Sequence, residues 1–512
     1  MAPAPRLPIV YVRGYAGGTA GIDSAVKDPF YGFNEGSTHI RIGPENEPGF
    51  YVFESPLLRL HLDEGYHILV DGSQDNYLAT HDTIPPDSIW IHRFYDPSAT
   101  TWGRAPREFQ LETAAEDLLS LIDTIMQKSE APAVHLVAHS MGGLVCRCLI
   151  QKILPDLGRD PRDCVGKFFT YGTPHGGIKF DVGFGLLERL RDVTRINGAE
   201  IFGPKRMYEY LTPRALRDPS GPPVNWDPRA MPQDHPWAFP LHRVFCLIGT
   251  NPTDYDVALG GLSAATVGPR SDGLVQIDNA YVPGAYQAYV HRSHSGSYGL
   301  VNSEEGYQNL RRFLFGDRKV DATLVGARLP QRADTTWQAE LLLSVRGLLI
   351  VTHERTSAHW CPIQLQDGTE PTAADPAEDG QVSVPLVTTF LCSGLRADDA
   401  STLRYALHLR ILSLHRRDGV LSFKDHLEQA ADFDDILVVD VGADSTAPVP
   451  AVSAAWNSAI AGPISTYRPE GPALQDENAT PGVWVNDIEL PVTAAPILGE
   501  NTRIRLTVTP WD

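Results

Sequence analysis

The sequence predicts an α/β fold with a mostly parallel sheet over about the first 316 residues, followed by an all-β domain. Strand-like and helix-like stretches alternate up to that point, and the alternation then stops. Later stretches show the two-residue period of strands instead. Because parallel strands need long crossovers, the early alternation predicts a parallel sheet with helices on both of its faces.

The expected elements of the first part follow from apolar patterns. Short apolar runs predict strands over residues 7–12, 88–95, 134–138, 167–171 and 244–248. Apolar residues recur at helical spacing over residues 111–126, with acidic residues on the other side. Further helices are predicted over 141–154, where Pro155 should end the helix, and over 307–315.

The second part should be a β-sandwich-like domain. Leu407, Leu409 and Ile411 alternate with polar or small residues, and Asp418-Gly419 supplies a hairpin turn after them. More strands are predicted over residues 382–390, 436–441, 483–492 and 503–509. We place the domain boundary at 316–320, which gives a first domain over 1–318 and a second over 319–512.

The alternation of the first domain is interrupted between about residues 178 and 240. An apolar, helix-compatible stretch comes first, and residues 213–240 then contain eight prolines with Trp226, Trp237 and Phe239. Long irregular insertions in a compact domain are typical of lids and binding loops. We therefore expect a lid-like insertion, in which the aromatic residues either line an acyl site or form a small core.

Composition narrows the function classes. The 512 residues include 63 acidic and 43 basic side chains, a net charge of −20, and residues 321–512 alone carry −13. Such a field repels nucleic acid and anionic lipid surfaces, so we expect neither partner. No apolar run reaches transmembrane length and no export signal is visible, which favours a cytoplasmic protein, or a secreted one that has lost its signal.

The strongest chemical signal surrounds Ser140. Residues 134–145 read VHLVAHSMGGLV, which predicts a buried strand, a tight turn with the serine at its apex, and a helix. Such a turn leaves room only for small residues two positions from the serine, and Ala138 and Gly142 satisfy this demand. The backbone N–H of Met141 would open the helix and stabilise an oxyanion. Ser140 is thus predicted to be a nucleophile.

Four segments resemble bacterial true lipases and esterases of the α/β-hydrolase superfamily. AHSMGG (138–143) resembles their nucleophile turn, RGYAGG (13–18) their His-Gly segment, GTPH (172–175) the segment after the next strand, and SDGLV (271–275) the segment that bears the acid. The resemblance covers about residues 7–315. It implies a Ser–His–Asp triad, an acyl-enzyme, an ester or lipid substrate, and no cofactor or metal. It also implies a second oxyanion donor at the backbone of Tyr15, although Arg13 stands where histidine is usual.

The acid and the base have competing candidates. Asp272 fits both the chain order and the SDGLV context, whereas Asp254 and Asp256 follow the strand at 244–248, the generic place for the acid in this fold. His294 is the preferred base because Ser295 and Gly296 follow it before the last helix. His291 is the alternative.

Other polar residues are expected to be structural. His139 and His175 should pack near the turn, and a zinc site at His175 is the alternative. The acidic residues 432, 434, 435 and 440 are expected to form a solvated face rather than a calcium site, and Cys146 and Cys148 to be buried thiols.

Several functions fit this sequence. A lipase or carboxylesterase comes first, and a phospholipase, polyester hydrolase or deacylase would use the same triad. A non-catalytic binding protein of the same fold is the alternative from another class. The second domain is expected either to bind surfaces or substrates or to serve structure and assembly.

Overall fold

The computed structural model describes residues 6–14, 18–42, 48–99, 109–178, 201–254, 267–330, 335–365, 382–396, 401–415, 431–444, 449–469, 471–478 and 480–512. The chain divides into two compact units. The N-terminal unit contains Ala4–Tyr286 and Arg292–Tyr307, and the C-terminal unit contains Gln287–His291 and Gln308–Asp512. Each unit is described by itself below.

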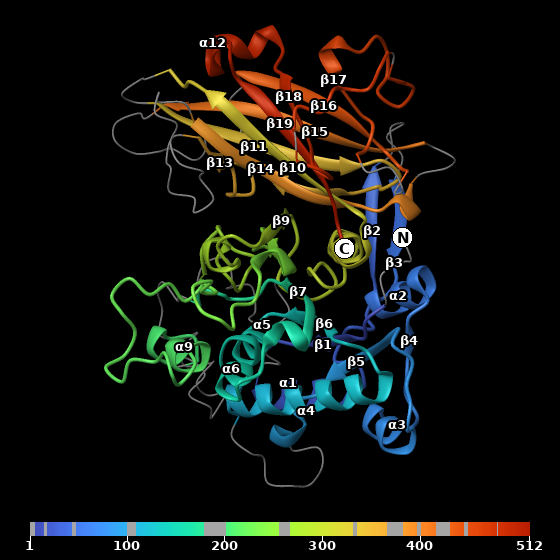
Figure 1. Ribbon diagram of the computed structural model, residues 1–512, viewed down its shortest axis with the longest axis vertical. Helices are drawn as coiled ribbons and strands as arrows, with labels where there is room; N and C mark the ends of the chain where they lie inside the picture. The colour runs from blue at the N-terminus through green and yellow to red at the C-terminus, as the bar shows by residue number, and fades with distance from the viewer. Residues whose placement is uncertain are drawn as a thin grey trace. The chain divides into compact units, whose positions relative to one another are not determined.

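A seven-stranded sheet organises the N-terminal unit (Figure 1). Its strands, in spatial order, are β4 (His67–Ile68), β5 (Ser88–His92), β1 (Ile9–Val12), β6 (Val134–His139), β7 (Val165–Tyr171), β8 (Val244–Gly249) and β9 (Tyr286–Val290). The pairs from β4 through to β8 are parallel. β1, β5 and β8 are buried throughout, as expected of parallel strands covered on both faces.

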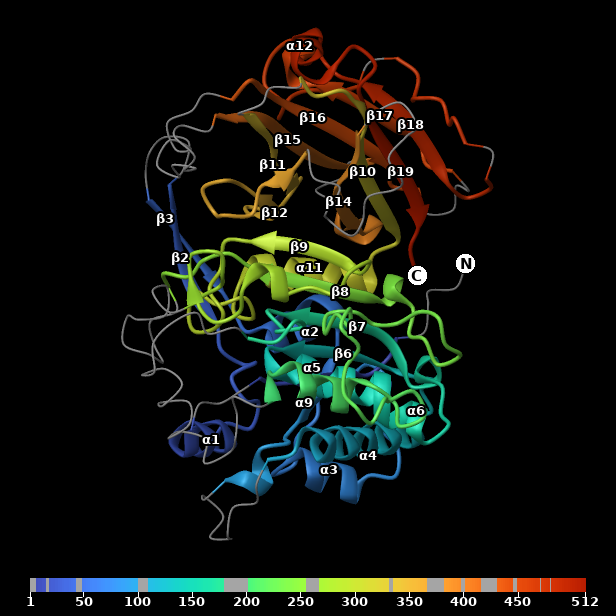
Figure 2. The same cartoon turned by 90° about the vertical axis from the view of Figure 1, so that its left-hand side faces the viewer.

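Helices and a hairpin surround this sheet. The helices are α1 (Gly18–Lys27), α2 (Pro56–Glu64), α3 (Gln74–Thr80), α4 (Leu111–Ser129), α5 (Met141–Cys148), α6 (Leu154–Asp156), α9 (Pro204–Leu211) and α11 (Glu304–Phe315). β2 (Ser37–Ile42) and β3 (Pro48–Phe53) form a separate antiparallel hairpin. α4 buries its apolar stripe and packs against α5, the helix that follows Ser140 (Figure 2). The predicted α/β-hydrolase fold is therefore confirmed.

One predicted helix end was wrong. The helix after Ser140 does not stop at Pro155 but continues through a π-helical turn, Leu149–Ile153, into α6, which includes the proline. Pro155 lies at the start of α6, where a missing backbone N–H is tolerated. The shift of hydrogen-bond register at the π turn lets the chain continue past the proline.

Two antiparallel sheets make up most of the C-terminal unit. One has the order β14 (Val382–Leu391), β10 (Arg318–Ala327), β19 (Arg503–Pro510), β18 (Trp484–Glu489). The other has the order β12 (Val351–Arg355), β11 (Thr335–Val345), β15 (Thr402–His415), β16 (Phe433–Gly442), β17 (Val452–Trp456), and β13 (Ile363–Gln364) also pairs with β11. A short helix, α12 (Ala495–Leu498), precedes β19.

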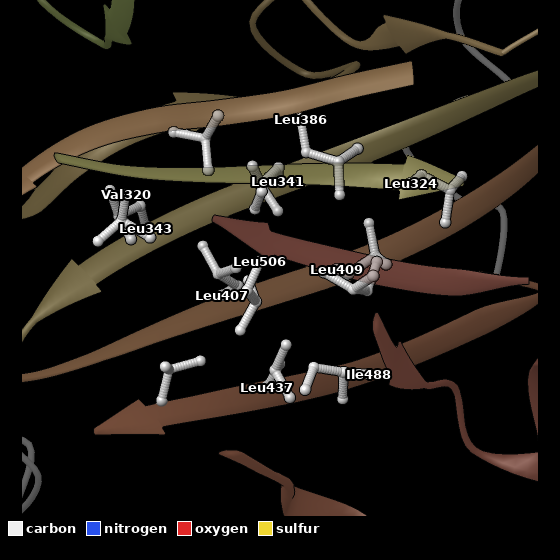
Figure 3. Packing of buried hydrophobic residues seen from close by; sticks show 14 of the residues in the cluster. Val320, Leu324, Leu341, Leu343, Leu386, Leu407, Leu409, Leu437, Ile488 and Leu506 are labelled. Atoms are coloured by element: carbon white, nitrogen blue, oxygen red, sulfur yellow. The ribbon is translucent and has the colours of Figure 1, made fainter. Parts of the chain in front are cut away.

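The two sheets share one apolar core. Leu324 on β10 and Leu506 on β19 belong to the same buried cluster as Leu341 on β11 and Leu409 on β15 (Figure 3). Alternate residues are buried over most of β10, so this strand presents one face to the core. This packing of two sheets bears out the predicted β-sandwich-like domain. The proposed turn at Asp418-Gly419 lies outside the described residues, and the boundary at 316–320 stays a prediction.

Candidate active site

Ser140 lies at the turn between β6 and α5. Its backbone has φ 54° and ψ −129°, a conformation that residues with a side chain rarely adopt. The Ser140 N–H donates to the Tyr171 carbonyl (2.9 Å), and the Thr173 hydroxyl donates to the Ser140 carbonyl (3.0 Å). These bonds to the end of β7 stabilise a strained turn, as expected of a nucleophile elbow.

Glycines allow neighbouring backbone to approach this turn. A Cβ on Gly142 would lie 2.2 Å from the Val12 carbonyl oxygen, and one on Gly143 would lie 2.1 Å from Thr173 Oγ1. A Cβ on Gly14, just after β1, would lie 2.3 Å from Ser140 Cβ. Gly14 therefore lies directly beside the serine. Sequence reasoning singled out Gly142 but attached no role to Gly14.

Asp272, His294 and Ser140 form a continuous hydrogen-bonded series. His294 Nδ1 lies 2.8 Å from Asp272 Oδ2, and His294 Nε2 lies 2.9 Å from Ser140 Oγ. In the neutral ring, Nδ1–H donates to the carboxylate, so Nε2 is free to accept the serine proton. The side chains come from three separate loops, and all three residues are at most 3 % exposed.

Backbone hydrogen bonds fix the position of the Asp272 carboxylate. Asp272 Oδ1 accepts from the N–H groups of Leu274 (3.0 Å) and Val275 (2.8 Å), within the Ser-Asp-Gly-Leu-Val turn. The His294 N–H donates to the Asp272 carbonyl oxygen at 2.8 Å. Asp272 Oδ1 thus accepts two backbone hydrogen bonds, while Oδ2 faces the imidazole of His294.

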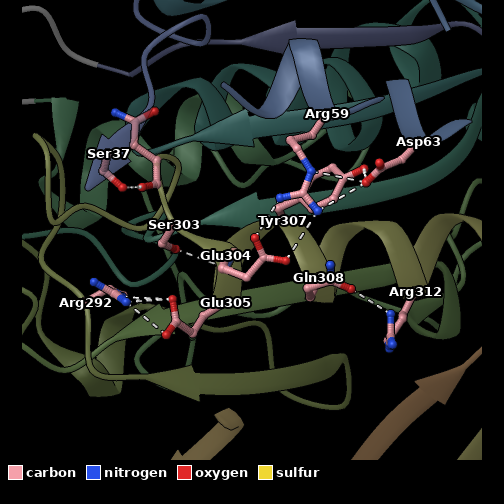
Figure 4. Close-up of polar contacts among 12 residues, drawn as sticks. Ser37, Arg59, Asp63, Arg292, Ser303, Glu304, Glu305, Tyr307, Gln308 and Arg312 are labelled. Carbon is pink, nitrogen blue, oxygen red and sulfur yellow. Dashed lines mark hydrogen bonds and ion pairs between the residues drawn. The ribbon is translucent and has the colours of Figure 1, made fainter. Parts of the chain in front are cut away.

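Ion pairs hold the loop that carries His294 (Figure 4). Arg292 binds Glu305 of α11 through both Nε (3.0 Å) and Nη2 (2.9 Å), and both side chains are largely buried. Arg59 of α2 binds Glu304 at 2.7 Å and stacks over Tyr307. The first turn of α11 is thereby bonded both to the histidine loop and to α2.

His139 bonds to the loop that carries His294. Its Nε2–H donates to the His294 carbonyl oxygen at 2.8 Å, and the two rings lie 4.9 Å apart. Burial lowers the pKa of His139 well below its usual range, and nearby His294 lowers it further. His139 therefore remains neutral and supports the loop, in keeping with the structural role predicted for it.

The rival acid and base have other partners. Asp254 accepts a bond from the Asn251 side chain at 2.7 Å, and Asp256 lies outside the described residues. His291 stacks on His359 with ring centroids 3.6 Å apart. Of the two histidines considered as the base, His294 is the one hydrogen-bonded to Ser140.

The two predicted oxyanion donors differ in what the structure describes. Met141 opens α5 immediately after Ser140 and is buried, so its N–H belongs to the unpaired first turn of a helix. Tyr15 lies outside the described residues. Gly14, the residue before it, touches the serine, as described above.

Arg147 is a buried cation that sequence reasoning missed. It lies on α5 with no exposed surface, and it donates to the carbonyls of His175 (3.1 Å), Pro228 (2.9 Å) and Ala230 (2.7 Å). Burial lowers its pKa to about 10, which leaves the guanidinium charged at neutral pH. The helix that follows Ser140, α5, is thus hydrogen-bonded to the insertion at residues 178–240.

The insertion packs around its own aromatic residues where the structure describes it, over 201–240. Trp226 lies edge-to-face on Tyr208 of α9 with centroids 5.2 Å apart, and Phe239 is buried. Residues 179–200 of the predicted lid lie outside the described residues. The lid role stays a prediction.

Other polar candidates have internal partners. His175 is fully buried, 3.3 Å from Thr170 Oγ1, and burial together with Arg147 lowers its pKa. The four acidic residues of the second domain do not form the solvated face that the sequence predicted, because Asp435 and Asp440 are buried. Asp432 accepts from the Ser413 N–H, Asp434 bonds to His408 and Arg410, Asp435 accepts from the Ser458 N–H and hydroxyl, and Asp440 pairs with Arg404. Within the described ranges, no three His, Cys, Asp or Glu side chains gather in a way that could hold a metal ion.

The sheet, the strained turn and the hydrogen-bonded side chains define a protein of the α/β-hydrolase fold with a Ser–His–Asp arrangement. No protein-family model and no curated protein matches the sequence. Among solved structures, the chain is similar to the Bacillus licheniformis lipase BlEst2, with a TM-score of 0.31 and 16 % identity over 61 % of this chain and 92 % of that one.

Two other solved structures are similar at the same level. Aspergillus fumigatus lipase B has a TM-score of 0.29 and 12 % identity over 61 % of this chain and 53 % of that one. Phospholipase PlaB from Legionella pneumophila has a TM-score of 0.30 and 10 % identity over 80 % and 90 %. Because these likenesses are distant, the function proposed below depends on the residues of this chain.

In the part of the chain that the structure describes, every helix is too short or too polar to span a bilayer.

Proposed function

We propose that this protein is a serine hydrolase of carboxylic esters, a lipase or esterase, in which Ser140 is the nucleophile, His294 the base and Asp272 the acid. The observation that carries the proposal is the hydrogen-bonded series from Asp272 through His294 to the serine hydroxyl, with contacts of 2.8 and 2.9 Å. Both distances lie within the range needed for proton transfer.

The first half-reaction forms an acyl-enzyme. Ser140 Oγ attacks the ester carbonyl while its proton moves to His294 Nε2, and the Asp272 carboxylate stabilises the imidazolium. The carbonyl oxygen becomes an oxyanion, for which the backbone N–H of Met141 is one donor and that of Tyr15 the proposed second. Each donor is worth about 3–4 kcal/mol in such sites.

The imidazolium completes the first half-reaction by returning its proton to the departing alkoxide, so the alcohol leaves and the acyl-enzyme remains. In the second half-reaction, water loses a proton to His294 and attacks the acyl carbonyl. His294 then returns that proton to Ser140 Oγ as the acid leaves, which restores the enzyme. The burial of all three side chains strengthens each electrostatic contact, because little water screens it.

Paired substitutions test the proposal. Ser140→Ala should abolish hydrolysis of p-nitrophenyl esters and labelling by a fluorophosphonate, whereas Ser120→Ala, an exposed serine on α4, should change neither. His294→Ala should lower kcat by roughly 10⁴-fold or more, and His291→Ala should leave it within a few-fold. A panel of esters from acetate to palmitate, with phosphatidylcholine, then defines the acyl preference.

Two results would contradict the assignment. Hydrolysis that persists in purified Ser140→Ala would show that another residue is the nucleophile. A folded wild-type protein that neither hydrolyses any ester of the panel nor reacts with the fluorophosphonate would favour a non-catalytic binding protein of this fold.

A further inference from the structure

A cavity in the C-terminal unit is lined by four arginines. It encloses about 290 Å³, including the open space at its mouth. Arg312, Arg346, Arg396 and Arg404 line it, together with Cys392. Because that volume includes open solvent, and the enclosed part is about the size of one water molecule, a ligand would lie at the open mouth of this cavity.

The four arginines come from four different segments. Arg312 is in the last turn of α11, Arg346 directly follows β11, Arg396 follows the 3-10 turn after β14, and Arg404 lies on β15. The Arg346 N–H donates to the Arg404 carbonyl at 2.9 Å. Arg312 and Arg404 are only 5 % and 6 % exposed. These two side chains are therefore fixed in the folded core, whereas Arg346 is partly exposed and Arg396 is exposed.

Two of the guanidinium charges are not balanced by a carboxylate. Arg404 makes a bidentate ion pair with Asp440, with a shortest contact of 2.8 Å, so that pair is neutral overall. Among the described residues, neither Arg346 nor Arg396 forms an ion pair, and Arg396 makes only a long bond of 3.4 Å to the Ser393 carbonyl. None of the described residues that line the cavity is acidic, although Asp440 binds Arg404 in its wall.

We propose that the cavity binds a phosphate group, either as free phosphate or as part of a larger phosphate-bearing molecule. Guanidinium groups bind phosphate oxygens through paired N–H donors, and two unbalanced charges match the charge of a phosphate near pH 7. This site is separate from the ester-hydrolase proposal, because none of its residues belongs to the Ser140 arrangement.

Cys392 gives a direct readout of occupancy. It lines the cavity, and it is the one cysteine of six that is not buried. In the full chain, inorganic phosphate should slow alkylation of Cys392 by N-ethylmaleimide relative to chloride at equal ionic strength. The thiol positions would be read by mass spectrometry after digestion, and calorimetric titration with phosphate gives an independent affinity.

Three variants that each lose one positive charge test whether the cavity arginines are responsible for phosphate binding. Arg346→Gln and Arg396→Gln should each weaken phosphate protection of Cys392 by about tenfold or more, since a hydrogen bond to a charged group is lost. Arg328→Gln, an exposed arginine of the same unit that does not line the cavity, should leave protection unchanged. Equal loss in all three variants, or no loss in the two cavity variants, would overturn the proposal.

A second part of the experiment tests whether the phosphate belongs to a lipid headgroup or to a soluble molecule. Vesicles of phosphatidylcholine with phosphatidic acid are compared with phosphatidylcholine alone in the same protection assay. Protection by phosphatidic acid vesicles but not by free phosphate assigns the site to a lipid headgroup, and the reverse assigns it to a soluble ligand. If neither phosphate nor vesicles protect Cys392 and calorimetry shows no binding, the cavity is not a phosphate site.

Discussion

Replacing Gly14 by alanine tests how the chain after β1 supports catalysis. The new Cβ would lie 2.3 Å from Ser140 Cβ, 2.8 Å from the His139 carbonyl oxygen and 3.0 Å from Ser140 Oγ. Non-bonded carbon atoms prefer separations of about 3.5–4 Å. Relief of the overlap therefore requires a shift of about 1 Å or more, either of the serine turn or of the segment that begins at Gly14.

Such a shift should act on kcat far more than on folding. A displacement of about 1 Å near reacting groups typically costs 100-fold, and loss of an oxyanion donor costs about 100- to 1,000-fold. We expect kcat for p-nitrophenyl butyrate to fall roughly 100-fold or more, with a smaller change in KM. Overpacking should cost about 1–3 kcal/mol of unfolding free energy, so the protein should remain folded at 25 °C.

The control is Gly394→Ala. A Cβ at Gly394 would meet only Cys392 Sγ, at an ordinary 3.8 Å, so neither kcat nor stability should change appreciably. Circular dichroism and thermal unfolding establish that each variant is folded. If folded Gly14→Ala keeps kcat within threefold of the wild type, the segment after β1 has no part in the reaction, and the oxyanion proposal for Tyr15 fails with it.

Three further predictions address the acid, a buried histidine and the buried cation. Asp272→Asn should keep the fold but lower kcat by roughly 10⁴-fold in ester hydrolysis, because the amide no longer holds the reactive tautomer of His294; a loss below tenfold would exclude Asp272 as the acid. Burial lowers the pKa of His92 to about 4, and its Nε2–H donates to the Ala114 carbonyl. Since the unfolded chain binds the proton more readily, this contribution is intact above pH 6.5 and falls by about 2 kcal/mol by pH 5. In urea unfolding, His92→Gln should reduce the loss of stability between pH 7 and 5 by that amount, and an unchanged pH slope would refute the effect. Arg147→Met should cost about 3 kcal/mol or more, because three carbonyls lose a buried donor; a change below 1 kcal/mol in urea unfolding would mean that water replaces the arginine.

The serine turn was predictable because its requirements are local. The apolar strand before Ser140, the small residues at Ala138 and Gly142 and the helix after it are all visible in twelve consecutive residues. Asp272 was predicted from the resemblance of its SDGLV segment and from the chain order, whereas the two N–H groups that its turn donates to its carboxylate are visible only in the structure. Strongly apolar strands such as β6 and β8 were also predictable, because burial on both faces leaves a continuous apolar run.

The choice between the two loop histidines was not decided by local pattern. His291 and His294 are three residues apart on one loop, and the direction of each ring depends on bonds to distant residues. The decisive hydrogen bonds join His294 to Asp272, 22 positions away, and Arg292 to Glu305, 13 positions away. β4 escaped prediction because its two residues, His67 and Ile68, carry no apolar pattern.

The buried arginine of α5 has a consequence for redesign of the insertion that it binds. Exchange of residues 201–240 for the corresponding segment of another enzyme would remove the carbonyls of Pro228 and Ala230 that Arg147 binds. The charge would then be stranded on the helix that begins beside Ser140. A productive graft therefore has to reproduce those two acceptors or replace Arg147 at the same time, so the segment and the helix are best varied as a single cassette.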